Sequence, residues 1–466
     1  MIHNNTHLHF VGIGGIGMSG IAEVFLNQGY RVSGSDLSDS DTTRKLKAQG
    51  AQIFQGHFTQ NVQGAKVVVV SSAIRPDNPE VLEAKRLRIP VIPRAEMLGE
   101  LMRGKTGIAV AGSHGKTTTT SMLATVLTQA QLDPTLVIGG KVDSLGGNAK
   151  LGQSQWVVAE ADESDGSFLH LPATYGVVTN IDNDHLDHFK SLEKVEEAFL
   201  GFVGKLPFYG LAAVCGEDPG VQRCLSRWTK PIRTYGLSAQ WDVYADDLRL
   251  EGLGSSFDVF ARESGSNAPH VRLGRLTLNV PGKHNVLNAL ATWVLSERIG
   301  LTFEQVQIGI QEFKGVKRRF EVRWKDDVQQ RVIVDDYGHH PTEITATLGS
   351  ARSYWKGRIL TIFQPHRYSR TLHCYDGFLN ALQLSDAVIL TDIYGAGEDP
   401  IEGISSERLV ADLKDRAHDD FSATYARDLD ACVNAVLEQS RPGDLILCMG
   451  AGTITRLPEK LMGALQ

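Results

Sequence analysis

The sequence has few cysteines, no long apolar run and no basic leader. Its five cysteines are scattered and never form a CxxC pair, which argues against a disulfide framework and a zinc ribbon. No apolar stretch approaches the roughly 18 residues that a membrane-spanning helix needs. The start, "MIHNNTHLHFVGIGG", runs into glycines and predicts a first strand rather than a signal peptide. We therefore expect a cytoplasmic protein without a membrane partner.

Long runs of one charge are also missing. The net charge of -7 is spread over 466 residues without a basic cluster, which disfavours a nucleic acid as partner. The composition, 42% hydrophobic and 22% charged, is typical of a globular protein, and this length predicts roughly three domains. We expect a monomer or a homodimer, between which the sequence does not decide.

Alternating strand and helix patterns occur in three successive sets. The first set, with runs such as "LHFVGIG" and "KVVVVSSA", predicts a parallel sheet covered by helices. The second begins at "IAVAGSHGKTTTT", and its period-two segments between 241 and 280 predict antiparallel edge strands. The third follows "KGVKRRFE". We predict an α/β protein with a Rossmann-like domain at 1–105, a central P-loop domain at 106–315 and a Rossmann-like domain at 316–466.

The first glycine-rich loop, "GIGGIG", contains no lysine. Gly12, Gly14 and Gly17 give GxGxxG between a predicted strand and helix, and Asp36 closes the next strand. Such a loop lets backbone amides and a helix N-terminus meet a pyrophosphate. Taken alone it is typical of an NAD site with Asp36 on a ribose hydroxyl, and it could also be a tight turn without a ligand.

The second loop, "AGSHGKTTTT", is more specific. Gly112, Gly115, Lys116 and Thr117 form a shortened GxxGKT, because Val110 stands where the usual phosphate loop has its first glycine. The order of strand, glycine turn, lysine, hydroxyl and helix lets the lysine reach the β- and γ-phosphates and the threonine hold Mg²⁺. The alternative is a plain helix start with a threonine cap.

Acidic side chains follow two later strands. Glu160 ends "QWVVAE", and Asp182, Asp184 and His185 follow "GVVTNI". The carboxyl ends of neighbouring parallel strands lie at one edge of a sheet, where a hard cation finds oxygen ligands. His185 with His188 could instead form a zinc pair, but no third soft ligand stands at zinc spacing. The group therefore favours Mg²⁺.

These motifs together resemble those of the Mur ligases, cytoplasmic enzymes that build the peptide of bacterial peptidoglycan precursors. The resemblance covers nearly the whole chain, with "GSHGKTT" as the shortened phosphate loop and "PGKHNVLNA" as the adenine-side motif. Within the family, "EADESDGSF", "DDYGHHPTEI" and "QPHRYSRT" are most similar to members that attach L-alanine to UDP-N-acetylmuramate. The member that attaches whole peptides during wall recycling shares the "HHP" segment but differs near "PHRYSRT".

The resemblance implies that the first loop holds the diphosphate of a UDP-sugar, so that lysine is needed only where a γ-phosphate is transferred. The implied substrates are UDP-N-acetylmuramate, L-alanine and ATP, with Mg²⁺ or Mn²⁺ as cofactor. The UDP-sugar would contact Gly12, Gly14, Gly15, Ile16, Gly17, Ser35, Asp36, Ser72, His114 and Arg318. ATP would contact Gly112, Ser113, His114, Gly115, Lys116, Thr117, Thr118, His284, Asn285, Asn288, Arg319 and Asp336.

The same resemblance implies roles in metal binding and catalysis. ATP would phosphorylate the lactyl carboxylate, and the amine of L-alanine would attack the acyl phosphate. The metal ligands would be Thr117, Glu160 and His185. The amino acid would meet Tyr337, His339, His366, Arg367 and Arg370. The catalytic residues would be Lys116, Glu160, His185, His339, Arg367 and Arg370.

Two other functions compete with this interpretation. An NAD-dependent oxidoreductase would explain the first glycine loop and Asp36, yet it leaves "GSHGKTT" without a purpose. A non-catalytic nucleotide switch would explain the second loop, but it leaves the acidic strand ends and the C-terminal arginines unexplained.

Overall fold

The computed structural model describes residues 6–71, 73–142, 147–183, 186–251, 253–266, 268–416 and 420–465. The chain divides into two compact units. The first unit comprises Met1–Asp247, Phe257–Leu276 and Leu287–Lys314, and the second comprises Leu248–Ser256, Thr277–Val286 and Gly315–Gln466. No helix among the described residues is long and apolar enough to cross a bilayer.

The N-terminal sheet is five-stranded, with the order β3-β2-β1-β4-β5 and parallel pairing throughout. Its first strand, HLHFV, is buried along its whole length, as expected of a strand with both faces covered. The strands are β1 (His7–Val11), β2 (Arg31–Asp36), β3 (Gln52–Gln55), β4 (Val67–Val70) and β5 (Val91–Pro93). The helices are α1 (Ile16–Asn27), α2 (Asp41–Ala48), α3 (Pro79–Arg86) and α4 (Arg94–Met102).

The central sheet has ten strands in the order β15-β14-β13-β12-β11-β10-β6-β9-β7-β8. Its core strands are parallel, and β8 pairs antiparallel with β7 at one edge. The strands are β6 (Thr106–Ala111), β7 (Thr135–Val142), β8 (Gly147–Lys150), β9 (Trp156–Glu160), β10 (Tyr175–Val178), β11 (Leu211–Cys215), β12 (Ile232–Gly236), β13 (Val243–Glu251), β14 (Gly254–Ala261) and β15 (Val271–Leu278). The helices are α5 (Lys116–Gln129), α6 (Leu186–Phe189), α7 (Leu192–Gly204), α8 (Pro219–Cys224), α9 (Lys283–Arg298) and α10 (Phe303–Glu312).

Helix α5 follows the second glycine loop and is buried from Thr118 to Leu127. Its hydroxyl-rich start, KTTTTS, would favour caps and turns over a helix interior. The structure satisfies two of these hydroxyls within the helix, since Thr120 Oγ1 donates to the Lys116 carbonyl at 2.8 Å and Ser121 Oγ to the Thr117 carbonyl at 2.6 Å. Thr117 Oγ1 donates instead to Glu160, and Thr119 Oγ1 is buried without a hydrogen-bond partner.

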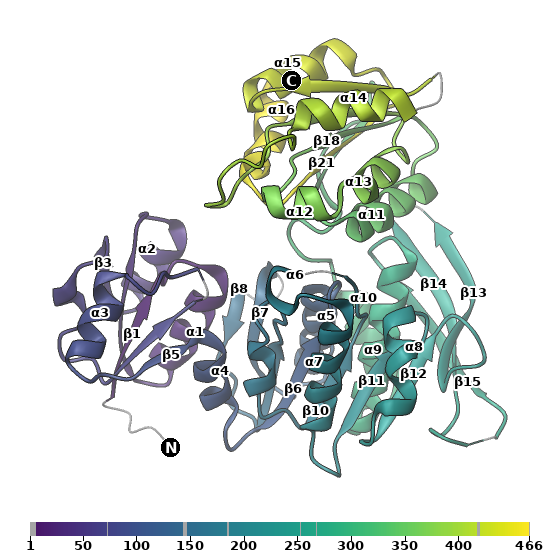
Figure 1. Ribbon diagram of the computed structural model, residues 1–466. Helices are drawn as coiled ribbons and strands as arrows, with labels where there is room; N and C mark the ends of the chain where they lie inside the picture. Colours follow the sequence, from purple (N-terminus) through teal and green to yellow (C-terminus); the bar gives the residue numbers. More distant parts are fainter. Residues whose placement is uncertain are drawn as a thin grey trace. The chain divides into compact units, whose positions relative to one another are not determined.

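The C-terminal sheet has six strands in the order β16-β17-β21-β18-β19-β20, and only the β16–β17 pair is antiparallel among the pairings of the described strands. Alternate residues of β17 face two apolar clusters, with α11, α13 and α14 on one face and α15 and α16 on the other (Figure 1). The strands are β16 (Glu321–Asp326), β17 (Arg331–Asp336), β18 (Ile359–Phe363), β19 (Ala387–Thr391), β20 (Ser422–Ala426) and β21 (Leu445–Met449). The helices are α11 (Pro341–Tyr354), α12 (Tyr368–His373), α13 (Tyr375–Leu382), α14 (Ser406–Arg416), α15 (Leu429–Gln439) and α16 (Leu457–Leu465).

The predicted α/β class with its mainly parallel sheets is confirmed. The predicted period-two segments correspond to β13, β14 and β15, which are successive neighbours at one edge of the central sheet, and β14 alternates between buried and half-buried residues. The sequence analysis did not identify β3, β7, β8, β11, β12, β16 or β20. Of these, β3, β8 and β20 are short strands with few large apolar residues.

Candidate active site

The first glycine loop joins β1 to α1 and is held by the end of β2. The amides of Gly12 and Ile13 donate to the Ser35 carbonyl at 2.8 and 3.0 Å, and the Gly14 amide donates to Asp36 Oδ2 at 2.9 Å. Gly15 is the N-cap of α1, and no side chain caps the helix. An uncapped helix start behind a glycine turn suits an anionic ligand. In this structure Asp36 braces the loop itself, which its spacing did not predict.

A buried polar network lies beneath this loop, and the sequence analysis missed it. Ser35 Oγ donates to Glu80 Oε2 at 2.6 Å and lies 2.9 Å from His57 Nδ1, while Asn61 Nδ2 donates to Glu80 Oε1 at 2.6 Å. Glu80 is fully buried, and these hydrogen bonds satisfy its carboxylate. The network fixes Ser35, whose carbonyl receives the loop amides. Ser72, which was predicted to meet the UDP-sugar, lies outside the described residues.

The second loop needs glycine at two positions. Gly115 caps α5 with φ 82°, a left-handed conformation that glycine adopts without strain. Gly112 has φ 137°, and a Cβ there would collide with Thr179. The residues after β10 close the loop from the other side. Thr179 Oγ1 donates to the His114 carbonyl at 2.6 Å, and the His114 amide donates to Asn180 Oδ1 at 2.8 Å.

Lys116 lies folded against the loop and a carboxylate. Its Nζ donates to the Gly112 carbonyl at 2.7 Å and lies 2.8 Å from Glu163 Oε2. The Lys116 side chain is 14% exposed and that of Glu163 1%. Burial alone would lower the pKa of the amine, but nearby carboxylates, that of Glu163 first, outweigh burial and raise the pKa of Lys116 above its ordinary value. The lysine is therefore a charged donor at neutral pH.

Thr117 and Glu160 meet beside the start of α5. Thr117 Oγ1 donates to Glu160 Oε1 at 3.0 Å, and the Gly139 amide of β7 donates to Glu160 Oε2 at 2.9 Å. Burial raises the pKa of Glu160 above its usual range, against the opposing charge of Lys116. A hydroxyl and a carboxylate are the oxygen ligands that a hard divalent cation takes, so this pair fits Mg²⁺. His185 lies outside the described residues.

Gly139 sets where the Glu160 carboxylate can lie. A Cβ at Gly139 would approach the Glu160 carboxyl atoms to 2.6–2.7 Å, closer than real Cβ atoms come to their neighbours. We expect Gly139→Ala to displace Glu160 and to raise the Mg²⁺ concentration for half-maximal activity about tenfold, since that change corresponds to about 1.4 kcal/mol. A Mg²⁺ titration of initial rates checks this. Gly204→Ala, at a position with open space in α7, is the matched control; equal midpoints in both variants would contradict the expectation.

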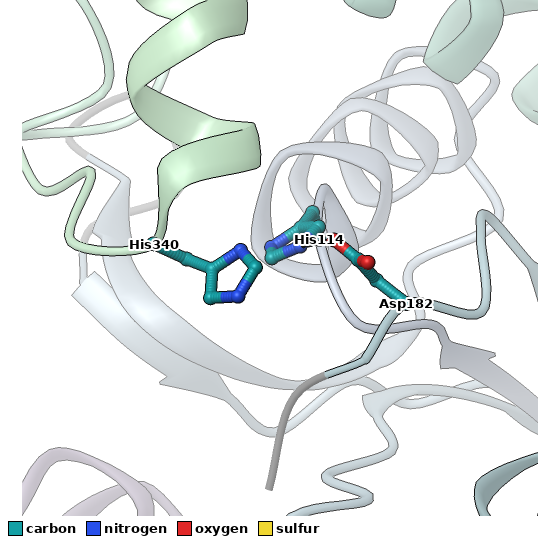
Figure 2. Close-up of side chains that lie close together, drawn as sticks. All are labelled: His114, Asp182 and His340. Carbon is teal, nitrogen blue, oxygen red and sulfur yellow. Dashed lines mark hydrogen bonds and ion pairs between the residues drawn. The ribbon is translucent and has the colours of Figure 1, made fainter. Parts of the chain in front are cut away.

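His114 pairs with an acidic residue that follows β10. Its Nε2 lies 2.8 Å from Asp182 Oδ2. Figure 2 shows the two side chains next to each other, with His114 at the turn before α5. The Asp182 amide in turn donates to Ser113 Oγ at 2.9 Å. The end of β10 is thus brought to the loop, as the strand-end argument predicted. Asn288 of α9 also lies beside this loop: a Cβ at Gly115 would come within 3.1 Å of Asn288 Oδ1.

In the second unit, Asp336 ends β17 in a buried position. Its carboxylate accepts from the amides of Phe320 and Gly338, each at 2.7 Å. Burial raises the pKa of Asp336 from 3.8 to about 6, although Arg319 opposes this shift. Arg319 pairs with Glu343 at 3.2 Å, and its positive charge acts on both Asp336 and His284. The predicted ATP residues His284, Arg319 and Asp336 are therefore linked electrostatically, with Asp336 buried, the Arg319 side chain 28% exposed and His284 exposed.

The raised pKa of Asp336 predicts a pH-dependent stability. A carboxyl whose folded pKa exceeds its unfolded value stabilises the fold below about pH 4, and this contribution is lost as pH rises through about 6. Wild type should therefore lose up to about 3 kcal/mol over that range relative to Asp336→Asn, at about 1.4 kcal/mol per pKa unit. Chemical denaturation of both proteins at pH 4, 5, 6 and 7 measures the difference. The asparagine's poorer fit to two amides adds only a pH-independent offset, so parallel curves would contradict the assignment.

The other predicted residues near Arg319 have defined partners. The Arg318 and Arg319 guanidinium carbons each lie 5.2 Å from the centre of the Tyr337 ring. Arg318 also pairs with buried Asp335 at 3.2 Å and donates to the Gly450 carbonyl at 2.6 Å. Asn285 Nδ2 donates to the Pro281 carbonyl at 2.7 Å, so this asparagine stabilises the start of α9.

The predicted amino-acid residues come from two separate segments and lie together. The His339 and His366 ring centres are 5.7 Å apart, and those of Tyr337 and His339 are 5.2 Å apart. Arg370 Nη1 lies 3.4 Å from His366 Nδ1. Burial, with the nearby arginines, lowers the pKa of His366 to about 4, which makes it a weak base at neutral pH. Tyr394, which the sequence analysis missed, stacks on His366 with ring centres 5.6 Å apart.

Comparison with known proteins matches this architecture over most of the chain. The Mur ligase family, catalytic domain, matches residues 7–106, the Mur ligase middle domain matches 110–296, and the Mur ligase, glutamate ligase domain, matches 318–452. The chain belongs to the Mur ligase family. The resemblance that the motifs indicated is thereby confirmed, and the family's three domain models follow the order of the three sheets.

Individual Mur ligases align over nearly their full length. A UDP-N-acetylmuramate--L-alanine ligase of Geobacter sulfurreducens is 53% identical over 461 residues, covering 98% of this chain and 97% of the relative. An enzyme of the same name from Geotalea uraniireducens is 51% identical, covering 98% of both chains. The crystal structure of the UDP-N-acetylmuramate-alanine ligase of Thermotoga maritima superposes with a TM-score of 0.82 at 30% identity, covering 99% of both chains.

Proposed function

We propose that the chain is an ATP-dependent ligase that adds L-alanine to the lactyl carboxylate of UDP-N-acetylmuramate, releasing ADP and phosphate. The observation that carries this proposal is that relatives bearing this enzyme name share about half of their residues with the chain along its full length. The phosphate loop with a charged, largely buried lysine and a neighbouring pair of hard oxygen ligands supports it.

The reaction must first make a carboxylate oxygen a better leaving group. The lactyl carboxylate attacks the γ-phosphorus of ATP and ADP leaves; the alanine amine then attacks the acyl carbon and phosphate leaves. The first attack brings an anion toward an anionic chain, and unit charges about 4 Å apart repel by about 4 kcal/mol at an effective dielectric of 20. The ammonium group of Lys116 would reduce this repulsion by donating hydrogen bonds to the phosphates.

Thr117 and Glu160 would hold Mg²⁺ or Mn²⁺, with His185 as a further ligand. The bound ion would supply positive charge to the phosphate oxygens. Glu160 is prepared for this because Gly139 and Thr117 already orient its two oxygens. Release of the Thr117 hydroxyl from Glu160 would free both groups to become ligands.

Each substrate has its own residues in this proposal. The first glycine loop would bind the diphosphate of the UDP-sugar through its backbone amides. The UDP-sugar would also contact Ser35, Asp36, Ser72, His114 and Arg318. The second loop, with His284, Asn285, Asn288, Arg319 and Asp336, would hold ATP. Arg367 and Arg370 would bind the carboxylate of L-alanine, since guanidinium groups suit carboxylates, and His339 would lie beside its amine.

We also propose the domain bounds 1–105, 106–315 and 316–466, and a cytoplasmic location. The matched ranges 7–106, 110–296 and 318–452 support the bounds. Peptidoglycan precursors are nucleotide-linked, and ATP is the implied phosphate donor, so both substrates belong to the cytoplasm.

The test measures phosphate release from ATP with UDP-N-acetylmuramate while L-alanine, glycine, L-serine or the peptide L-alanyl-γ-D-glutamyl-meso-diaminopimelate is supplied in turn. Release that depends on L-alanine, with a product heavier by one alanine residue, is expected. Fastest turnover with the peptide would replace the proposal by a peptide-recycling ligase. Phosphate release at the same rate with and without these amines would contradict any ligase activity.

A further inference from the structure

The segment that carries the two proposed carboxylate-binding arginines begins in a strained conformation. Arg367, which precedes α12, has φ 69° and ψ 137°, a region that non-glycine residues rarely adopt. Such a backbone costs on the order of 1–3 kcal/mol and persists only where its surroundings hold it. The Arg367 side chain makes no capping hydrogen bond to α12. Other groups must therefore hold the start of this helix.

The loop after β19 supplies those groups. The Arg367 amide donates to the Tyr394 carbonyl at 2.8 Å, and the Tyr394 amide donates to the Pro365 carbonyl at 2.9 Å. Glu398 then accepts twice from one residue of α12: Ser369 N donates to Oε2 at 2.9 Å and Ser369 Oγ to Oε1 at 2.7 Å. Both oxygens of this carboxylate are therefore directed at the first turn of α12.

The loop is itself built to place that carboxylate. The Glu398 amide donates to the Gly395 carbonyl at 2.9 Å, closing a turn in which Ala396 has φ 50° and Gly397 φ 90°. A Cβ at Gly395 would lie 2.9 Å from the Glu398 carbonyl oxygen and 3.2 Å from the Tyr368 ring. The turn thus lies directly against α12, without room for a side chain between them.

Charge adds to this geometry. Arg367 and Arg370 lie on the same short helix start, where like charges repel, and Arg367 Nη1 is 4.0 Å from Glu398 Oε1. The carboxylate offsets the positive charge of Arg367, while Arg370 Nη1 lies 3.4 Å from His366 Nδ1. One carboxylate therefore acts on both the backbone and the charge of the arginine segment.

We propose that Glu398 is a positioning residue for the amino-acid substrate: by clamping Ser369 it holds Arg367 and Arg370 in the orientation that binds the substrate's carboxylate. This inference rests on the proposed function, in which these arginines meet L-alanine. Glu398 itself acts through the arginine segment. A plain helix cap would matter for stability alone, whereas a positioning residue changes the affinity for one substrate out of three.

The test compares KM values for L-alanine, ATP and UDP-N-acetylmuramate in Glu398→Gln. Glutamine keeps the size of the side chain but replaces one acceptor oxygen by a donor that faces Ser369. The KM for L-alanine should rise at least about tenfold, while the other two KM values stay within about twofold. Ser369→Ala, which loses only the hydroxyl bond, should raise the KM for L-alanine about threefold. Glu402→Gln, at an exposed residue of the same connection, is the matched control and should change nothing.

The results distinguish a failure of the proposed function from a failure of the positioning role of Glu398. Wild type that does not turn over with L-alanine overturns the proposed function before any variant is measured. Wild type that turns over, with an unchanged alanine KM in a folded Glu398→Gln, overturns only the positioning role. A lower Tm with every KM unchanged would also overturn it, because that is the effect of a plain helix cap. Equal rises of all three KM values would overturn it too, because they show no selective effect on L-alanine.

Discussion

Lys116→Ala is expected to lower phosphate transfer from ATP by about 10³-fold or more while UDP-N-acetylmuramate binds with nearly unchanged Kd. The lysine belongs to the loop that would hold the γ-phosphate, and the first glycine loop contains no lysine. Removing a group that stabilises charge in a transition state lowers the rate about 10²- to 10³-fold. Few other cations would lie beside the phosphate chain of ATP. Single-turnover phosphate release and calorimetric titration of the UDP-sugar measure the two effects.

The single variant also leaves Glu163 buried without its partner. Breaking a buried ion pair on one side costs about 3–5 kcal/mol, so the protein could lose activity by unfolding. The double variant Lys116→Met with Glu163→Gln removes both charges and should recover most of the stability but none of the activity. Lys194→Ala, whose exposed side chain pairs with Glu197, is the control for loss of a lysine elsewhere. Turnover in the folded double variant would contradict the role of Lys116.

The glycine loops were predictable from the sequence because their chemistry is local. Gly112, Gly115, Lys116 and Thr117 fall within six residues, and the left-handed φ of Gly115 is the kind of constraint that glycine spacing reports. The class of fold was predictable for the same reason, since buried strands such as β21 are continuous apolar runs. The predicted class of fold is confirmed by the sheets and by the family, and the ligands of the two loops stay predictions.

The partners of those loops could not be predicted, because they come from distant strands. Glu163 lies 47 positions from Lys116, and Gly139 lies 21 positions from Glu160. Glu80 reaches Ser35 from α3, 45 positions away. Nothing in a single sequence pairs such positions, and a glycine within a strand, such as Gly139, more often marks a bulge. The sheet order places these groups next to each other.

Sequence spacing also did not predict the contacts that one carboxylate makes within the loop. Asp36 stands where a dinucleotide fold has its ribose ligand, yet its Oδ2 accepts from Gly14 and its Oδ1 from the Ser38 amide at 3.1 Å. A carboxylate that accepts hydrogen bonds from a glycine loop and one that accepts them from a ribose hydroxyl stand at the same sequence position, so spacing does not distinguish the two roles. The roles assigned to Asp36 and to the other site residues stay predictions until ligands are measured.

Glu160→Gln is the second variant with a large expected effect. Glutamine can still accept one of the bonds from Gly139 and Thr117, but it carries no charge for the metal. We expect the maximal rate to fall about 10² to 10³-fold, a loss typical of removing one electrostatic stabiliser, and the Mg²⁺ midpoint to rise more than tenfold. Initial rates across a Mg²⁺ and a Mn²⁺ titration measure both quantities.

Two further results would decide what this loss means. Burial raises the pKa of Glu160, so replacing it by a neutral side chain removes a desolvated charge, and the Tm of Glu160→Gln should not fall below that of wild type. A large loss of activity in a protein of undiminished stability then locates the effect in metal binding. A rate that excess Mg²⁺ restores fully would agree with weakened affinity alone, whereas an unchanged Mg²⁺ midpoint would remove Glu160 from the metal site and leave Thr117 without its proposed companion.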